Sequence, residues 1–253
     1  MILGWGARSD RGSVRQVNED ALVAWPPIFL VADGMGGHAA GDVASRIAVE
    51  QFERMVGQEV VSVADASSAI EQANKAIVQC IVSDPARAGM GTTIAVLTVV
   101  RLGGSEHWLV LNVGDSRVYR LAGGRLQQMT VDHSEAEEMV AAGRLTPSEA
   151  RHYRRRHVVT RALGTDPAPQ VDSWVFPPGP DDRFLICTDG LTNELDDDEI
   201  SRCLSAADPQ AAAEELVRRA ISAGGRDNVT VIVVDGRPLA EVDLAQDTAP
   251  RLQ

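Results

Sequence analysis

Short apolar runs bounded by glycine, proline or aspartate recur along the chain and predict buried strands. The first run occupies residues 29–32, between Pro27 and an Asp-Gly pair. Residues 22–23 begin a strand that Pro26-Pro27 interrupts, which indicates a hairpin with the 29–32 strand. Further apolar and β-branched runs predict strands at residues 92–100, 108–113, 118–121, 183–187 and 229–234.

A helical spacing of apolar residues predicts two long helices after this hairpin. The first covers residues 43–55, and the second covers residues 63–82, where Asp84-Pro85 ends it. Shorter helices are predicted at residues 135–142, after the capping box at 146–149, from 196–199 onward, and at 209–223. The chain therefore mixes α and β structure, and these patterns alone do not fix the order of its layers.

The sequence has no internal repeat or low-complexity linker, so we expect a single domain over residues 1–236 with a C-terminal tail at 237–253. Residues 132–163 are charged and have few large apolar side chains, which is typical of a surface insertion. The basic run at 151–157 could recognise an acidic or phosphorylated partner. We favour the simpler interpretation of a solvated basic helix face.

A carboxylate at the end of the first buried strand is the most informative polar position. Asp33 follows the apolar run directly, and Gly34, Gly36 and Gly37 come next. Burying an unpaired carboxylate costs several kcal/mol or raises its pKa until it is neutral. Glycines at the turn let a backbone carbonyl or a ligand approach closely. We interpret Asp33 as a metal ligand, although an Asp-Gly turn would also explain this position taken alone.

Three further carboxylates occupy similar junctions and favour the metal interpretation. Asp189 ends the 183–187 strand, Asp227 precedes the 229–234 strand, and Asp115 lies between two apolar runs. Mg2+ and Mn2+ take oxygen ligands, whereas zinc sites use paired Cys or His side chains. The acidic cluster at 196–199 opens a helix and is explained by the helix dipole, so we leave it out of the site.

Composition and charge narrow the classes of function. The 253 residues are 44% hydrophobic and 24% charged, as in ordinary globular proteins, and the net charge is −12. This acidic balance argues against nucleic acid or an anionic membrane as a partner. The 3 cysteines lack C-x-x-C spacing, which argues against disulfides and zinc. Because no apolar run approaches the roughly 18 residues of a membrane span, we expect a soluble, cytoplasmic protein.

A set of short motifs runs in order through the chain from about Gly4 to Val234. They are Arg15 with Asn18-Glu19-Asp20, Ala32-Asp33-Gly34-Met35-Gly36-Gly37-His38, Gly91-Thr92-Thr93, Gly114-Asp115-Ser116-Arg117, Asp132-His133-Ser134, Thr160-Arg161-Ala162-Leu163-Gly164, Thr188-Asp189-Gly190-Leu191 and Gly225-Arg226-Asp227-Asn228-Val229-Thr230. Taken together, the motifs resemble those of the metal-dependent Ser/Thr protein phosphatases of type 2C (the PPM family), in particular the bacterial branch. One Asp-Gly pair is weak evidence, whereas this ordered set is specific.

The resemblance implies an α+β fold, a four-layer αββα sandwich in which two packed antiparallel β-sheets are flanked by helices. It also implies two core ions, Mn2+ or Mg2+. Asp33 matches the residue that bridges them, and Gly34 matches the residue whose carbonyl binds the second ion. Asp189 and Asp227 match ligands of the first ion.

Four further positions take their implied roles from the same resemblance. Glu19 and Asp20 match acidic residues that hold metal-bound waters, and Asn228 matches a residue behind the ligands. Asp115 matches a residue that, with the Asp189 position, binds a third, weaker ion in bacterial members. Arg15 matches the arginine that grips the substrate phosphate, which a guanidinium can bind through two oxygens at once.

The activity implied by the family is hydrolysis of phosphoserine and phosphothreonine by direct attack of a water or hydroxide that bridges the two metals. The implied partners are phosphorylated Ser/Thr proteins, including a bacterial Ser/Thr kinase. We expect a monomer without nucleic acid or membrane partners. A metal-dependent hydrolase of small phosphoesters and a non-catalytic phosphoprotein-binding module are alternatives. The binding module is disfavoured because the sequence has a matching residue at every position that holds the core metals.

Two positions depart from the family pattern. Eukaryotic relatives have a histidine directly after the Asp-Gly pair, proposed as general acid, where this chain has Met35, and we do not assign that role to His38. We expect residues 132–163 to match the flap that sets substrate access. Bacterial members can supply an acidic flap residue to the third ion, but no carboxylate lies between Glu149 and Thr165, so that site could be incomplete.

Overall fold

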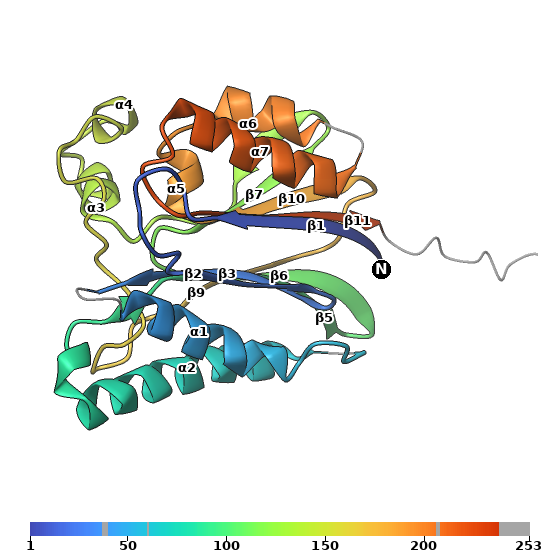
Figure 1. Ribbon diagram of the computed structural model, residues 1–253. Coiled ribbons are helices and arrows are strands. Elements are labelled where there is room, and N and C mark those ends of the chain that lie inside the picture. The colour runs from blue at the N-terminus through green and yellow to red at the C-terminus, as the bar shows by residue number, and fades with distance from the viewer. Residues whose placement is uncertain (37–39, 60, 206–207, 238–253) are drawn as a thin grey trace, which may run out of the picture.

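Two antiparallel β-sheets pack face to face, and helices cover the outer face of each sheet (Figure 1). The computed structural model describes residues 1–36, 40–59, 61–205 and 208–237. One sheet has the strand order β1 (Ile2–Asp10), β11 (Val229–Arg237), β10 (Asp182–Cys187), β7 (Arg117–Ala122) and β8 (Arg125–Gln128). The other has the order β2 (Asp20–Trp25), β3 (Ile28–Met35), β5 (Ile94–Leu102), β6 (Ser105–Val113) and β9 (Asp172–Phe176), with β4 (Gly91–Thr92) paired to β3. The expected four-layer sandwich is confirmed.

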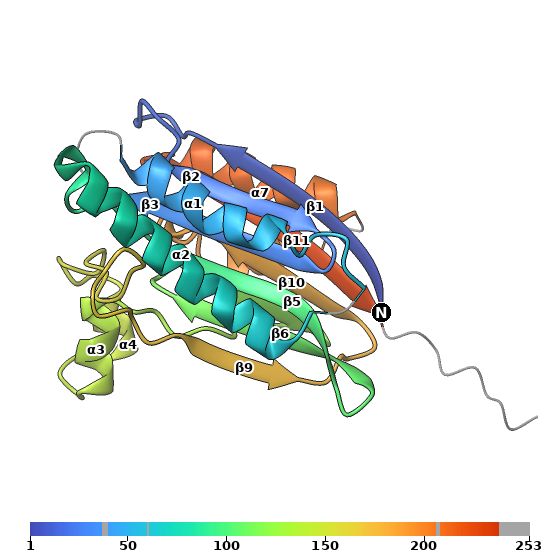
Figure 2. The same ribbon diagram turned by 90° about the horizontal axis from the view of Figure 1, so that it is seen from below.

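The helices form the outer layers and one end of the molecule. Figure 2 shows α1 (Gly41–Glu53) and α2 (Val63–Ser83) lying across the sheet that contains β3 and β5, and the 3-10 turn Pro85–Arg87 follows α2. The opposite layer consists of α5 (Asp189–Thr192), α6 (Asp197–Leu204) and α7 (Pro209–Ala223). Two short helices, α3 (Glu135–Ala141) and α4 (Pro147–Ala150), stand together at one end of the sandwich in both views. Among the described residues, no helix is both long enough and apolar enough to cross a membrane.

The central strands are buried on both faces, which explains their unbroken apolar runs. Leu30 of β3 packs in the core beneath α1 and α2, whereas Phe29 and Val31 pack between the two sheets. In β10, Leu185 packs in the core beneath α6 and α7, and Phe184 packs between the sheets. Because successive side chains of a strand point to opposite faces, a strand between two cores must be apolar at every position.

Most of the elements predicted from the apolar pattern are present. The predicted hairpin is confirmed, since β2 pairs with β3 and places Asp20 opposite Asp33. The predicted helix at 209–223 coincides with α7. The predicted strand at 92–100 is divided into β4 and β5, with a break at Thr93.

The strands β1, β8 and β9 were not predicted because they lie at sheet edges and lack continuous apolar runs. The four-residue helix α5 was not predicted either, because its sequence reads as an Asp-Gly turn. The expected basic helix face at 151–157 is wrong, since α4 ends at Ala150 and the following residues form turns. Arg237 of the predicted tail is the last residue of β11, and residues 238–253 lie outside the described residues.

We predict that Gly6→Ala destabilises the protein because Gly6 is the point where β1 approaches α7. A Cβ at this position would lie 2.3 Å from the Gln210 backbone. The expected cost is about 1–3 kcal/mol of unfolding free energy, measured by urea denaturation. Gly4→Ala is the matched control on the same strand, because its Cβ would meet nothing closer than 3.9 Å. Equal stability of the two variants would contradict this account of the β1–α7 contact.

Candidate active site

Carboxylates from five separate segments meet at one end of the sandwich, beside α5. Asp20 begins β2 and lies opposite Asp33 of β3. Asp115 lies in the turn from β6 to β7, Asp189 begins α5 directly after β10, and Asp227 lies just before β11. Because β2, β3 and β6 belong to one sheet and β7, β10 and β11 to the other, the site forms where both sheets end.

A cavity of about 530 Å³, here called the first cavity, opens at this place. Most of the site residues predicted from sequence line it, namely Arg15, Glu19, Asp33, Gly34, Asp115, Asp189 and Asp227. Asp20 does not line the cavity. Its Oδ2 accepts hydrogen bonds from Thr230 at 2.6 Å and Thr188 at 2.9 Å, and its charge acts on Asp33. The structure therefore gathers the predicted site residues on one cavity, except for Asp20, which lies behind its lining and acts on Asp33.

Desolvation and mutual repulsion disfavour the charged forms of these carboxylates. Burial, followed by the charges of Asp20 and Asp189, raises the pKa of Asp33 well above its ordinary value. Burial raises the pKa of Asp20 to about 7, although hydrogen bonds from two threonine hydroxyls act in the opposite direction. Burial and the charge of Asp189 also raise the pKa of Asp115. A divalent cation would favour the charged forms and so remove this repulsion.

The donor set fits a hard divalent cation. Besides the converging carboxylates, Asp20 Oδ1 is a buried oxygen that has no hydrogen-bond partner in the described part of the chain. In the same part, no group of three or more His, Cys, Asp or Glu side chains is gathered closely enough to hold a metal ion alone. Binding one ion through three carboxylates would therefore require these side chains to move closer together, whereas binding through one or two carboxylates and several waters, as is usual for Mg2+, would not.

Two threonines hold the backbone of Asp33 in place. Thr93 donates its N–H to the Asp33 carbonyl at 2.9 Å, and its Oγ1 accepts the Asp33 N–H at 3.0 Å. The Thr92 hydroxyl also donates to the Asp33 carbonyl at 2.9 Å. Thr93 Oγ1 lies 2.7 Å from the hydroxyl of Ser116, which follows Asp115. The Gly-Thr-Thr motif, whose role the sequence did not explain, therefore joins the positions of Asp33 and Asp115.

Gly34 is required by close packing. Its N–H donates to the Glu19 carbonyl at 3.1 Å, and a Cβ on Gly34 would lie 2.1 Å from the Gly41 carbonyl oxygen at the start of α1. A Cβ on Gly41 would in turn lie 2.6 Å from Glu19 Oε1. The two glycines let the end of β3, the first turn of α1 and the Glu19 side chain meet at the cavity.

Arg15 reaches the cavity from the loop between β1 and β2. Its Nη2 donates to Asp227 Oδ2 at 2.8 Å, and this hydrogen bond raises the pKa of the guanidinium. Asn228 fixes the loop, because its Nδ2 donates to the Val17 carbonyl at 2.9 Å and its Oδ1 accepts the Glu19 N–H at 2.8 Å. Asn228 was expected only as a residue behind the ligands, and this contact with the Arg15 loop could not be read from the sequence.

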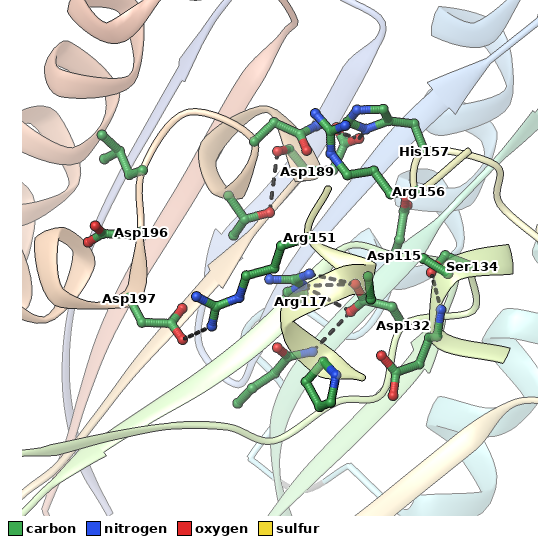
Figure 3. A pocket seen from close by; sticks show the side chains of 18 of the residues that line it. Asp115, Arg117, Asp132, Ser134, Arg151, Arg156, His157, Asp189, Asp196 and Asp197 are labelled. Atoms are coloured by element: carbon green, nitrogen blue, oxygen red, sulfur yellow. Dashed lines mark hydrogen bonds and ion pairs between the residues drawn. The ribbon is translucent and has the colours of Figure 1, made fainter. Parts of the chain in front are cut away.

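A second cavity of about 450 Å³ adjoins the first, and Figure 3 shows its lining side chains. Arg156 and His157 line both cavities, although the basic run that contains them was interpreted as solvated. His157 Nδ1 lies 4.0 Å from Asp189 Oδ2, and Arg151 Nη2 lies 3.8 Å from Asp197 Oδ2. The basic run was the sequence signal for these cavity residues. Because it is far along the chain from Asp33 and Asp115, the sequence did not indicate that it lies beside these carboxylates.

His38, the histidine nearest the Asp-Gly pair, lies outside the described residues. Met35, at the family position of the proposed general acid, is the last residue of β3 and lines the first cavity.

Comparison with known sequences and structures now identifies the family. The family described as "Protein phosphatase 2C" matches residues 10–219. The chain belongs to the protein phosphatase 2C family. Serine/threonine protein phosphatase PstP of Mycobacterium tuberculosis is 38% identical over 93% of this chain, which spans only 45% of that protein's length. Serine/threonine phosphatase stp of Listeria monocytogenes is 36% identical, with 90% of this chain and 94% of that protein covered.

A solved structure supports both the fold and the metal chemistry of this family. The catalytic domain of PstP in complex with two manganese ions superposes with a TM-score of 0.83 at 35% identity. The alignment covers 93% of this chain and 99% of that domain. The α+β sandwich described above is therefore the phosphatase 2C fold.

We predict that Asp33→Asn makes the metal-free protein more stable. The pKa of Asp33 is raised in the folded state. The contribution of Asp33 to folding stability is therefore fully present below its pKa in the unfolded state, about 3.9, and is lost as the pH rises through its pKa in the folded state. In EDTA, the Tm advantage of the variant over wild type should therefore be small near the pKa of the unfolded state and grow as the pH rises above it. Asp181→Asn, at an exposed turn, is the control for loss of one charge. A metal-free variant less stable than wild type at pH 8 would refute the predicted repulsion.

Proposed function

We propose that this chain is a metal-dependent protein serine/threonine phosphatase that hydrolyses phosphoserine and phosphothreonine. The observation that carries the proposal is the meeting of Asp33, Asp189 and Asp227 on one cavity that Arg15 also lines. Carboxylates suited to binding hard cations thus line the same cavity as a guanidinium suited to binding a phosphate. The two manganese ions in complex with the related PstP domain support the same assignment.

The metal ligands are proposed from this geometry and from membership of the family. Asp33 would be shared by two Mn2+ or Mg2+ ions, Asp189 and Asp227 would bind the first, and the Gly34 carbonyl would bind the second. Asp115, together with Asp189, would bind a third and weaker ion, since both line the two cavities. When bound, the core ions supply Lewis-acid activation of a water and neutralise charge at phosphorus.

Glu19 and Asp20 would hold waters around the ions. Asp20 is suited to this role because its Oδ2 is fixed by two threonine hydroxyls while Oδ1 has no hydrogen-bond partner among the described residues. Glu19 lines the cavity, and its backbone N–H is fixed by Asn228. Asp20 therefore offers an oriented acceptor, and the Glu19 backbone is fixed beside the cavity.

Arg15 would bind the phosphate of the substrate. Its side chain is 48% exposed and is held by Asp227 through one nitrogen, so the remaining N–H groups of the guanidinium are available at the cavity. A planar guanidinium binds two phosphate oxygens in a fixed geometry. The hydrogen bond to Asp227 would set the guanidinium beside the metal ligands before substrate arrives.

We further propose one catalytic domain over residues 1–236, extended by Arg237 of β11, in which residues 132–163 form a flap beside the site. Arg156 and His157 support the flap assignment because they line the first cavity. The substrates would be phosphorylated Ser/Thr proteins, including a bacterial Ser/Thr kinase. We propose that the protein is monomeric and acts in the cytoplasm.

The proposed activity is tested by phosphate release from a phosphothreonine peptide with Mn2+, with Mg2+ and after EDTA. Wild type should release phosphate only with a divalent ion, and Asp189→Ala should lose at least about a hundredfold in rate because it removes a core ligand. Asp181→Ala serves as the surface control. Release that survives EDTA, or full activity of Asp189→Ala, would contradict the site. Activity on small phosphoesters but not on the peptide would favour the alternative substrate class.

The role of Arg15 is tested by Arg15→Lys on the same peptide. Lysine keeps the charge but loses the bidentate fork, so we expect KM to rise about tenfold or more, while the number of bound Mn2+ ions stays unchanged. Arg11→Lys is the matched control, since Arg11 lies in the same loop but outside the lining of the first cavity. Kinetics of Arg15→Lys indistinguishable from those of Arg11→Lys would show that Arg15 does not bind the phosphate.

A further inference from the structure

His133 holds the residue before Asp115 from two directions. Its ring nitrogen Nδ1 accepts the Gly114 N–H at 3.0 Å, and its own backbone N–H donates to the Gly114 carbonyl at 3.0 Å. The His133 side chain is only 4% exposed. The Gly114 carbonyl also accepts from Asn112 Nδ2 at 3.1 Å, whereas its N–H is bonded to the buried His133 ring, a residue distant in the chain from Asp115.

These bonds also define the state of the imidazole ring. A backbone N–H can only donate, so Nδ1 carries no hydrogen and the ring is neutral, with its hydrogen on Nε2. Nε2 then donates to Asp172 Oδ2, at 3.1 Å, at the start of β9. Arg161 Nη1 lies 3.1 Å from Nε2 and 3.2 Å from Asp172 Oδ1. Because Nε2 is a donor here, the guanidinium bonds the carboxylate rather than the ring.

The backbone around His133 also closes the base of the flap. The His133 carbonyl accepts the Thr160 N–H at 2.8 Å, and Glu135 N–H donates to the Val158 carbonyl at 2.9 Å. Ser134 and Val159 form an antiparallel bridge between these bonds. The two ends of the flap thus pair with each other at His133, directly beside the loop that carries Asp115.

Within the part of the chain that the structure describes, the Asp115 carboxylate lacks the side-chain hydrogen bonds that hold Asp20 and Asp189. Among the described residues, its carboxylate forms no hydrogen bond with another side chain, whereas Asp20 is held by two threonines and Asp189 by Asn193 at 2.9 Å. Its position is therefore set by the backbone of the β6–β7 turn. Gly114 adopts a φ of +109°, and a Cβ there would lie 2.5 Å from Thr93, so the turn has little room to adjust.

We propose that His133 is a positioning residue that holds Asp115 in place beside the base of the flap. It acts through the hydrogen bond from the Gly114 N–H to Nδ1 of its ring. The inference rests on the proposed function, in which Asp115 is a ligand of the weaker ion. Residues that orient ligands in this way typically contribute 10–100-fold to metal affinity or activity. The bond to Asp172 has a separate role in holding the ring to β9.

Two substitutions distinguish the contributions of the two ring nitrogens of His133. His133→Asn keeps an acceptor at the place of Nδ1 and removes Nε2, whereas His133→Gln places its amide near Nε2 and leaves the Gly114 N–H without its acceptor. His107→Asn is the control, since His107 lies on β6 outside the lining of both cavities and its Nδ1 lies 3.1 Å from the Ser105 carbonyl. Each protein is compared for Tm, for Mn2+ binding by calorimetry without substrate, and for kcat and KM against Mn2+ concentration.

We expect His133→Asn to stay within about threefold of wild type in its Mn2+ dependence. His133→Gln should need about 10–100-fold more Mn2+ for half-maximal kcat, with KM for the peptide little changed, and should match Asp115→Asn. The combination of His133→Gln with Asp115→Asn should lose no more than Asp115→Asn alone, because both changes act on one ligand. In calorimetry, only the weakest Mn2+ binding step should be lost.

Equal losses in folded His133→Asn and His133→Gln, or fully additive losses with Asp115→Asn, would overturn the inference. If His133→Gln does not fold, His133→Asn alone decides the question. An impaired Mn2+ response in folded His133→Asn would contradict the inference, and a normal Mn2+ response would support the role of Nδ1. Failure of the proposed function has a different signature, namely wild type without phosphate release. The calorimetric comparison of the variants would then still decide whether His133 positions a metal ligand.

Discussion

The repulsion among the carboxylates at the end of the sandwich, where both sheets end, is the constraint on which the rest of this structure depends. Asp20, Asp33, Asp115 and Asp189 are partly or wholly desolvated, and burial is the largest cause of the raised pKa of each. Such a cluster opposes folding at neutral pH unless cations neutralise it. The apolar cores on both sides of each sheet must therefore supply the stability that this end of the sandwich removes.

Around the carboxylates, uncharged groups hold the geometry. Thr92 and Thr93 fix the backbone of Asp33, Asn228 fixes the loop of Arg15, and His133 fixes Gly114. None of these groups adds negative charge to the cluster, and each satisfies backbone groups that would otherwise be buried without partners. The short motifs thus divide into residues that we propose to bind ions or phosphate and residues that hold those in place.

The sequence was most informative where one physical signal dominated. The double burial of β3 and β10 made their apolar runs unmistakable, and carboxylates at the ends of such runs indicated the site. The edge strand β1 was missed because Gly4 and Gly6 interrupt its apolar pattern, and Gly6 is explained only by the approach of α7. The roles of His133 and Arg156 depend on contacts between segments far apart in the chain. A pattern along the chain cannot reveal such contacts, and the order of the layers came from the family resemblance for the same reason.

The central claim is that these carboxylates form one site for two cations, and anomalous scattering from crystals soaked in Mn2+ tests it most directly. The account predicts two strong manganese peaks in the first cavity. One should contact the carboxylates of Asp33, Asp189 and Asp227, and the other should contact Asp33 and the Gly34 carbonyl. Manganese bound elsewhere, or a cavity that stays empty of metal while the carboxylates remain in place, would contradict it.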